Sequence, residues 1–186
     1  MSFLQSLRLL SSCTCIFFLI AAALSSPAQQ VASLIDPAKL ATLAARGANP
    51  RVQKYTAQLQ EARLAGLDPA QVAVDAVALT GMTGDAARLT AEAMLRNLRI
   101  AGQLGCLTVE GLAEMRRGRS PTIQTGPYAG DQLSVDHVIP FAAFPALDNT
   151  IANLELRPLR LNLRKRDAMG LRQLDLRQRL RQAGLF

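Results

Sequence analysis

The chain is poor in aromatic residues: it has no tryptophan, two tyrosines and six phenylalanines among 186 residues. It has a single histidine, His137, and only one of its three cysteines, Cys106, lies outside the N-terminal segment. This scarcity excludes a disulfide framework, a zinc site built from cysteines and any site that needs two imidazoles. Ala and Leu are abundant and β-branched residues are sparse, which favours helix over sheet. Cys106 is expected to be buried in a helical core.

Positive charge is concentrated in the C-terminal part of the chain. Residues 1–115 carry nine Lys or Arg and eight Asp or Glu, a net of +1, whereas residues 116–186 carry twelve and six, a net of +6. Nearly all of these cations are arginines, whose planar fork of donors suits phosphate. The pattern indicates a polyanionic partner, nucleic acid before a membrane surface. Solubility alone is the alternative interpretation.

Residues 1–28 have the pattern of a secretory signal sequence. A short, weakly positive start is followed by an uncharged apolar run over 9–24 and then by small residues at Ser26 and Ala28. Cleavage after Ala28 would export the protein to the periplasm or the medium and leave it without a stable membrane partner. An uncleaved membrane anchor is the alternative.

Residues 29–115 carry repeated helix start and end signals. Asp-Pro and Asn-Pro pairs supply a capping side chain and a proline at the first helical position, and glycines follow the ends. The expected helices lie between Asp36 and Gly47, Asn49 and Gly66, Asp68 and Gly81, Thr83 and Leu104, and Thr108 and Arg117. We expect a packed helical scaffold, with a partner-binding module as the alternative.

The pattern changes in residues 116–186. Gly, Pro, Ser and Thr predict a loop over 116–132, an apolar run predicts a strand over 133–139, and residues 153–161 can form a second, antiparallel strand. A helical pattern begins at Asn162 and continues as a basic amphipathic helix to about residue 182, with an interruption near Gly170. The predicted fold class is α+β, mostly α: a helical region, a strand–loop–strand–helix unit and a C-terminal basic helix.

This unit contains an ordered set of residues that suits phosphodiester hydrolysis. His137 can act as a general base because the ordinary pKa of imidazole, about 6.5, lies near physiological pH. Asp136 and Asn162 offer the hard oxygen ligands that Mg²⁺ prefers. Asn153 is expected to hold the second imidazole nitrogen, and Lys165 to meet phosphate. Taken singly, each residue has a structural alternative as a turn former, helix cap or solvated side chain.

The strand geometry sets one requirement on this site. Neighbouring residues on a strand point to opposite faces, so Asp136 and His137 can share one site only at a bulge or at the strand end. Asp148 and Asn149 are weaker candidates for the metal. Further phosphate contacts are expected from Arg119, Arg164 and Arg166.

Asp-His at the first strand, Asn153 at the second and Asn162-x-x-Lys165 at the helix resemble the ββα-metal motif of HNH endonucleases. The resemblance is to the subgroup that ends in Asn rather than His, and it covers residues 116–175. The loop Gly-Pro-Tyr-Ala-Gly at 126–130 is similar to one in exported bacterial HNH-like proteins. Many members carry zinc-binding cysteine pairs that this chain lacks, so the helical region is expected to brace the fold.

The resemblance implies a metal-dependent endonuclease of low sequence specificity that acts on DNA rather than RNA. Mg²⁺ is the first choice of metal, with Mn²⁺ or another transition metal open. One alternative is an inactive exported nucleic-acid-binding or envelope protein of the same fold. Another is a secreted antibacterial toxin with the same chemistry, whose partner would be an immunity or inhibitor protein.

Overall fold

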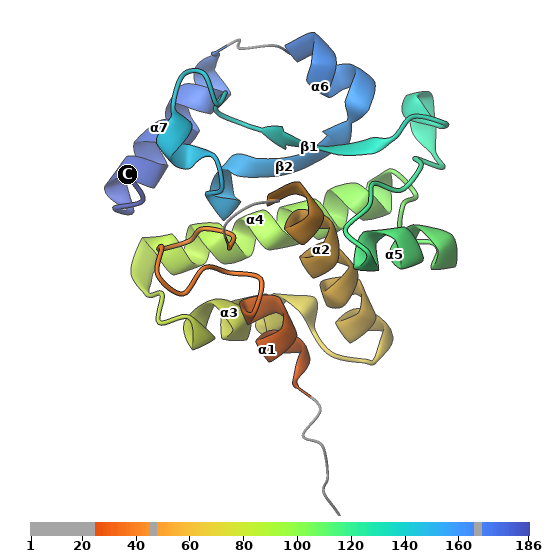
Figure 1. Cartoon of the computed structure of the whole chain (residues 1–186), viewed down its shortest axis with the longest axis horizontal. Helices are drawn as coiled ribbons and strands as arrows, with labels where there is room; N and C mark the ends of the chain where they lie inside the picture. Colours follow the sequence, from red (N-terminus) through yellow and green to blue (C-terminus); the bar gives the residue numbers. More distant parts are fainter. Residues whose placement is uncertain (1–24, 45–47, 166–168) are drawn as a thin grey trace, which may run out of the picture.

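The computed structural model describes residues 25–44, 48–165 and 169–186, which form the expected α+β fold with helices predominating (Figure 1). The helices are α1 (Pro27–Ala32), α2 (Ala48–Leu64), α3 (Pro69–Leu79), α4 (Gly84–Gln103), α5 (Val109–Arg116), α6 (Leu159–Lys165) and α7 (Leu171–Gln182). The strands are β1 (Leu133–His137) and β2 (Leu154–Pro158), and three short 3₁₀ helices are η1 (Gly126–Tyr128), η2 (Pro145–Leu147) and η3 (Ile151–Asn153).

The predicted signal segment lies outside the described residues up to position 24. Ser26 accepts a hydrogen bond from the Gln29 backbone N–H and begins α1, so Ala28 lies within the first turn of that helix. Within the described residues, no helix combines the length and apolar character that a membrane span requires.

Four of the five expected helices in the first part of the chain are confirmed as α2 to α5. Local capping explains where two of them begin: the Asp68 carboxylate accepts from the Ala70 N–H at the start of α3, and the Thr108 hydroxyl accepts from the Gly111 N–H in α5. Cys106 is buried in the core as expected, and burial raises the pKa of its thiol to about 11.

The prediction of a helix between Asp36 and Gly47 is wrong over the described residues, 36–44. The Asp36 side chain accepts from the backbone N–H two residues later and closes a turn instead of capping a helix. Leu43 then pairs with the chain far ahead, because its N–H donates to the Asn149 carbonyl at 2.9 Å. Tertiary pairing with the segment beside the candidate site therefore overrides the local start signal.

β1 and β2 pair antiparallel as predicted, in a register that runs from Leu133 opposite Pro158 to His137 opposite Leu154. One face of this two-stranded sheet is apolar and packs toward α4, while α6 lies on the other side and α7 runs along the edge, where it also contacts α4 (Figure 1). The loop predicted over 116–132 begins after Arg116, the last residue of α5, and contains the short η1 and a bridge between Thr122 and Gln132.

The sheet is attached to the helical region through Asn97 of α4, whose side chain is completely buried. Its Nδ2 donates to the Tyr55 hydroxyl at 2.6 Å and to the Leu154 carbonyl at 3.1 Å, and its Oδ1 accepts from the Leu156 N–H at 2.8 Å. Burial raises the pKa of Tyr55 to about 12, which keeps the hydroxyl neutral. Because a two-stranded sheet is marginal alone, the helices provide the bracing that the sequence required of them.

We expect Asn97→Ala to lower the free energy of unfolding by about 3 kcal/mol, because the Leu156 N–H loses its partner in buried surroundings. Urea unfolding measures this change. Gln103→Ala, at an exposed position of the same helix, is the matched control and should change the value by less than about 0.5 kcal/mol. Equal effects of the two substitutions would contradict the role given to Asn97.

Candidate active site

Asp136 lies on the side of the sheet that α6 covers, and it is held by two cations. Its side chain is 8% exposed, and its Oδ2 accepts from the Lys165 ammonium at 2.8 Å and from the Arg157 guanidinium at 3.2 Å. The Lys165 side chain is equally buried, at 7% exposed, and its Nζ also donates to the His137 carbonyl. The buried carboxylate is therefore charge-compensated within the protein.

Glu155 stands opposite Asp136 in the strand register and carries a second set of ion pairs. Arg96 of α4 lies 3.2 Å from its Oε2, and Arg172 of α7 binds both of its oxygens. Burial lowers the pKa of Arg96, whereas the nearby carboxylate of Glu155 acts in the opposite direction. Together the two carboxylates connect the sheet to α4, α6 and α7.

His137 ends β1 and points toward the loop that follows. Its Nε2 lies 2.9 Å from both the carbonyl oxygen and the carboxylate Oδ1 of Asp148. Both partners are acceptors, so in the neutral ring Nε2 carries the hydrogen and Nδ1 keeps its lone pair. The side chain is 28% exposed. One nitrogen of the ring is thus held in place while the other can accept a proton.

Asn153 does not contact the imidazole, so the role predicted for it is wrong in this geometry. The side chain is buried: its Oδ1 accepts from the Ile139 N–H at 2.7 Å, and its Nδ2 donates to the carbonyls of Ile139 and Leu147. It therefore ties the start of the loop between the strands to Leu147, the residue before Asp148. Asp148, ranked low from the sequence, is the residue that holds His137.

Asn162 lies inside α6 rather than at its start, because α6 begins at Leu159. The cap comes from a distant residue: Asp131 accepts from the Arg160 N–H at 3.0 Å, and this hydrogen bond lowers the pKa of Asp131. Asn162 is free for another task, and its Nδ2 donates to the Ser134 hydroxyl and the Val135 carbonyl, each at 3.2 Å. Its amide thus faces β1.

Asp136 and His137 point away from each other. The pairing of β1 with β2 runs to His137 without a bulge, and the strand ends there. Alternation places the two side chains on opposite faces, and their contacts agree, with Asp136 toward α6 and His137 toward Asp148. The Lys165 ammonium, which touches the Asp136 carboxylate and the His137 carbonyl, links the two residues at the strand end.

The donor set offers a divalent ion two hard oxygens. The side-chain hydrogen bonds of Asp136 are made through Oδ2 and those of Asn162 through Nδ2. Among the described residues, the Oδ1 atom of each side chain has no hydrogen bond and could bind a cation. No group of three or more His, Cys, Asp or Glu able to hold a metal occurs in that part of the chain. Carboxylate and amide oxygens are the kinds of ligand that Mg²⁺ prefers, and Lys165 lies against the same carboxylate.

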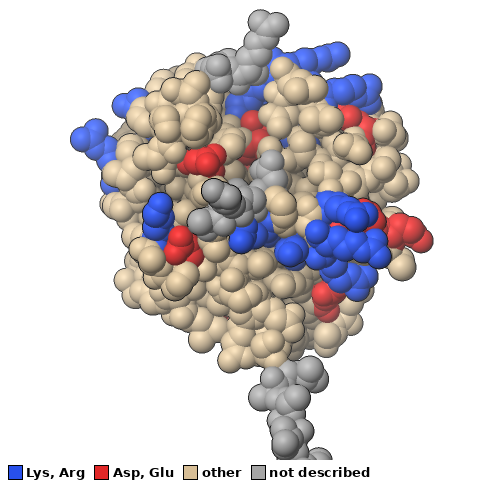
Figure 2. Space-filling view, viewed as in Figure 1, with Lys and Arg blue, Asp and Glu red and all other residues tan. Residues whose placement is uncertain are grey.

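A basic hollow of about 570 Å³ lies next to these residues, between α6 and the start of α7. Its cations are Arg157, Arg164, Lys165 and Arg172. In the space-filling view, Lys and Arg lie at the top of the molecule, where α6 lies, and form another group at the right, beside α5 (Figure 2). Of the other predicted phosphate contacts, Arg166 lies outside the described residues, and Arg119 pairs with Glu114 at 3.6 Å near the end of α5, not in this hollow.

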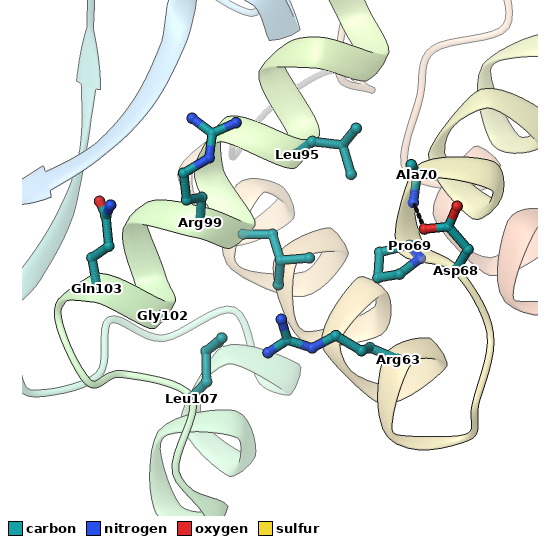
Figure 3. Close-up of a pocket in the computed structure, with 10 residues that line it drawn as sticks. Arg63, Asp68, Pro69, Ala70, Leu95, Arg99, Gly102, Gln103 and Leu107 are labelled. Atoms are coloured by element: carbon teal, nitrogen blue, oxygen red, sulfur yellow. Dashed lines mark hydrogen bonds between the residues drawn. The ribbon is translucent and has the colours of Figure 1, made fainter.

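A second hollow, of about 440 Å³, lies in the helical region between α2, α3 and α4 (Figure 3). Its lining includes Arg63, Arg99 and the apolar side chains of Leu95, Leu98 and Leu107. It contains none of the residues predicted from the sequence to carry function. The basic hollow beside Asp136 is thus the one that belongs to the candidate site.

No protein-family model, curated protein or solved structure matches this chain. The case for a function therefore rests on the geometry of the chain itself.

His137 is the only histidine, so a long-range ¹H–¹⁵N correlation spectrum will contain one set of imidazole signals. We expect a protonated Nε2 and an unprotonated Nδ1 at pH 8, because both partners of Nε2 accept hydrogen bonds. Asp148→Ala should retain this tautomer in the main population, since the Asp148 carbonyl stays in place. A ring protonated at Nδ1 in the unsubstituted protein would contradict the assignment.

Proposed function

We propose that the chain is an HNH-type endonuclease that hydrolyses phosphodiester bonds, of DNA before RNA, with His137 as its general base. The observation that carries this proposal is the fixed imidazole. Asp148 holds Nε2, and Nδ1 is left as a proton acceptor on a partly exposed ring. The basic hollow supplies a complementary surface for phosphate, but it lies on the Asp136 side of β1, so the proposal requires the reacting phosphate to reach Nδ1 of His137 around the end of the strand.

In the proposed reaction, Nδ1 of His137 takes a proton from the water that attacks phosphorus. The bond to the 3′ oxygen breaks, this oxygen takes a proton from solvent water to become a 3′ hydroxyl, and the other product carries a 5′ phosphate. The hydrogen bond from Nε2 to Asp148 keeps the ring oriented while it becomes positively charged, and the carboxylate stabilises that charge. Arg164 and Lys165 would hold the substrate phosphates in the hollow without reading bases.

Asp136 and Asn162 would hold the divalent ion, Mg²⁺ first and Mn²⁺ or another transition metal as alternatives. When bound, such an ion would neutralise charge on the phosphate and on the departing oxygen. The proposed activity has low sequence specificity. We further propose export to the periplasm or medium, from the pattern of residues 1–28, and an inhibitor protein as partner if the chain acts as a toxin.

A second candidate function is a basic nucleic-acid-binding protein of the same fold without turnover. One observation favours it: the Asp136 carboxylate already holds two cations of the protein itself. A carboxylate that is paired with the protein's own cations can have a structural role or a role in binding, without catalysis. Both candidate functions require affinity for nucleic acid, but only the nuclease cleaves it.

Plasmid cleavage by the purified full-length chain separates these candidates. We expect nicking with Mg²⁺ or Mn²⁺, none with EDTA, and a rate at least about 100-fold lower for His137→Ala, the low end for loss of a general base. Arg63→Ala, in the hollow of Figure 3, is a control that should cleave like the unsubstituted protein. Absence of cleavage by the folded protein with every metal, or equal cleavage by His137→Ala, would leave the binding function.

Arg164→Ala should weaken DNA binding several-fold and make the logarithm of affinity less dependent on the logarithm of salt concentration. Loss of one phosphate contact lowers that slope by about 0.9. Fluorescence anisotropy of a labelled duplex at several salt concentrations measures both quantities, again with Arg63→Ala as the comparison. An unchanged slope for Arg164→Ala would show that the basic hollow does not bind the duplex.

A further inference from the structure

We infer that Lys165 is a built-in competitor for divalent ions at Asp136, so that its ammonium weakens metal binding at the site it helps to form. The inference rests on the proposed function, because it concerns the same carboxylate, but it makes a separate statement about affinity. The ligand class is a hard divalent cation. The competing group is part of the chain.

The first observation is the closeness and burial of the pair. The ammonium lies 2.8 Å from Asp136 Oδ2, and both side chains are more than nine-tenths buried. A divalent ion bound through the other oxygen of this carboxylate, at about 2.1 Å, would lie a few Å from the ammonium. Like charges repel strongly at that separation in poorly hydrated surroundings. Metal affinity must therefore be lower while the ammonium is in place.

The second observation is that Lys165 also lines the basic hollow, which can receive its ammonium group. Lys165 is the last residue of α6, so rotation of its flexible four-carbon side chain can carry the ammonium from Asp136 into that hollow. There it would lie with Arg164 and Arg172, in the place proposed for substrate phosphate. The same side chain can therefore close the cation site or serve the phosphate site.

The third observation concerns what remains when the ammonium leaves. Arg157 also binds Asp136, at 3.2 Å, so the carboxylate would not be left as a lone buried charge. Asn162 would remain beside β1, because its hydrogen bonds go to Ser134 and Val135. The site is thus expected to keep its shape in a variant without the lysine charge.

The test uses Mn²⁺ alone as the probe and the full-length chain, with free Mn²⁺ measured by electron paramagnetic resonance. Lys165→Met removes the charge and keeps the length of the side chain, and we expect it to bind Mn²⁺ at least tenfold more tightly than the unsubstituted protein. Lys39→Met removes the same charge at an exposed position and should bind as the unsubstituted protein does. Combining Lys165→Met with Asp136→Asn should abolish the gain.

Equal Mn²⁺ affinity of Lys165→Met and the unsubstituted protein would overturn the inference. So would a gain that is matched by Lys39→Met or that survives Asp136→Asn, since the ion would then bind elsewhere. Circular dichroism and the urea midpoint establish that each variant is folded. If Lys165→Met is not, Lys165→Gln, which retains hydrogen bonding without charge, takes its place with the same expected gain.

The outcomes also separate this inference from the nuclease proposal. An Asp136-dependent gain in a protein that cleaves nothing would support the competition and reject the nuclease. Metal-dependent cleavage without any gain in Lys165→Met would support the nuclease and reject the competition.

Discussion

The attachment of β2 to α4 is the constraint on which the rest of the structure depends. Asn97 exchanges hydrogen bonds with the backbone of Leu154 and Leu156, and Arg96 donates to the carbonyls of Ala152 and Leu154. Two strands alone bury too little surface to be stable. Through these bonds the long helix and the core beneath it hold a small sheet in one place, and Asp136, His137 and Lys165 lie on that sheet or beside it.

The outer face of the sheet adds a layer of buried charge. Asp136 and Glu155 stand opposite each other, and each holds two cations that come from other elements. Ion pairs in such surroundings are costly to desolvate, so they contribute little net stability compared with apolar packing. These ion pairs instead fix the positions of α6 and α7 relative to the sheet, and they hold the Asp136 carboxylate and the Lys165 ammonium together near the end of β1.

The inner side of the strand end serves a different purpose. The loop after β1 returns to the start of β2, and Asn153 holds it by bonding Ile139 near its start and Leu147 in η2. That geometry brings Asp148 to the imidazole of His137. The proposed proton acceptor, His137, and the proposed cation ligand, Asp136, are neighbours at the end of β1, and Lys165 contacts both residues. This arrangement is what the nuclease proposal and the competition for Asp136 have in common.

The positions of helices and strands that depend on residues close together in the chain could be predicted from the sequence alone. Capping side chains and prolines located α2 to α5, and the apolar run ending at His137 located a strand that pairs with the one after Asn153. Tertiary structure decided what depends on distant partners. Pairing with residues 149–151 holds residues 41–43 outside the expected helix, Asp131 caps α6 in place of Asn162, and Lys165, which was expected at phosphate, contacts Asp136. Side chains such as Asn153 can bond many groups, and only the path of the folded chain selects among them.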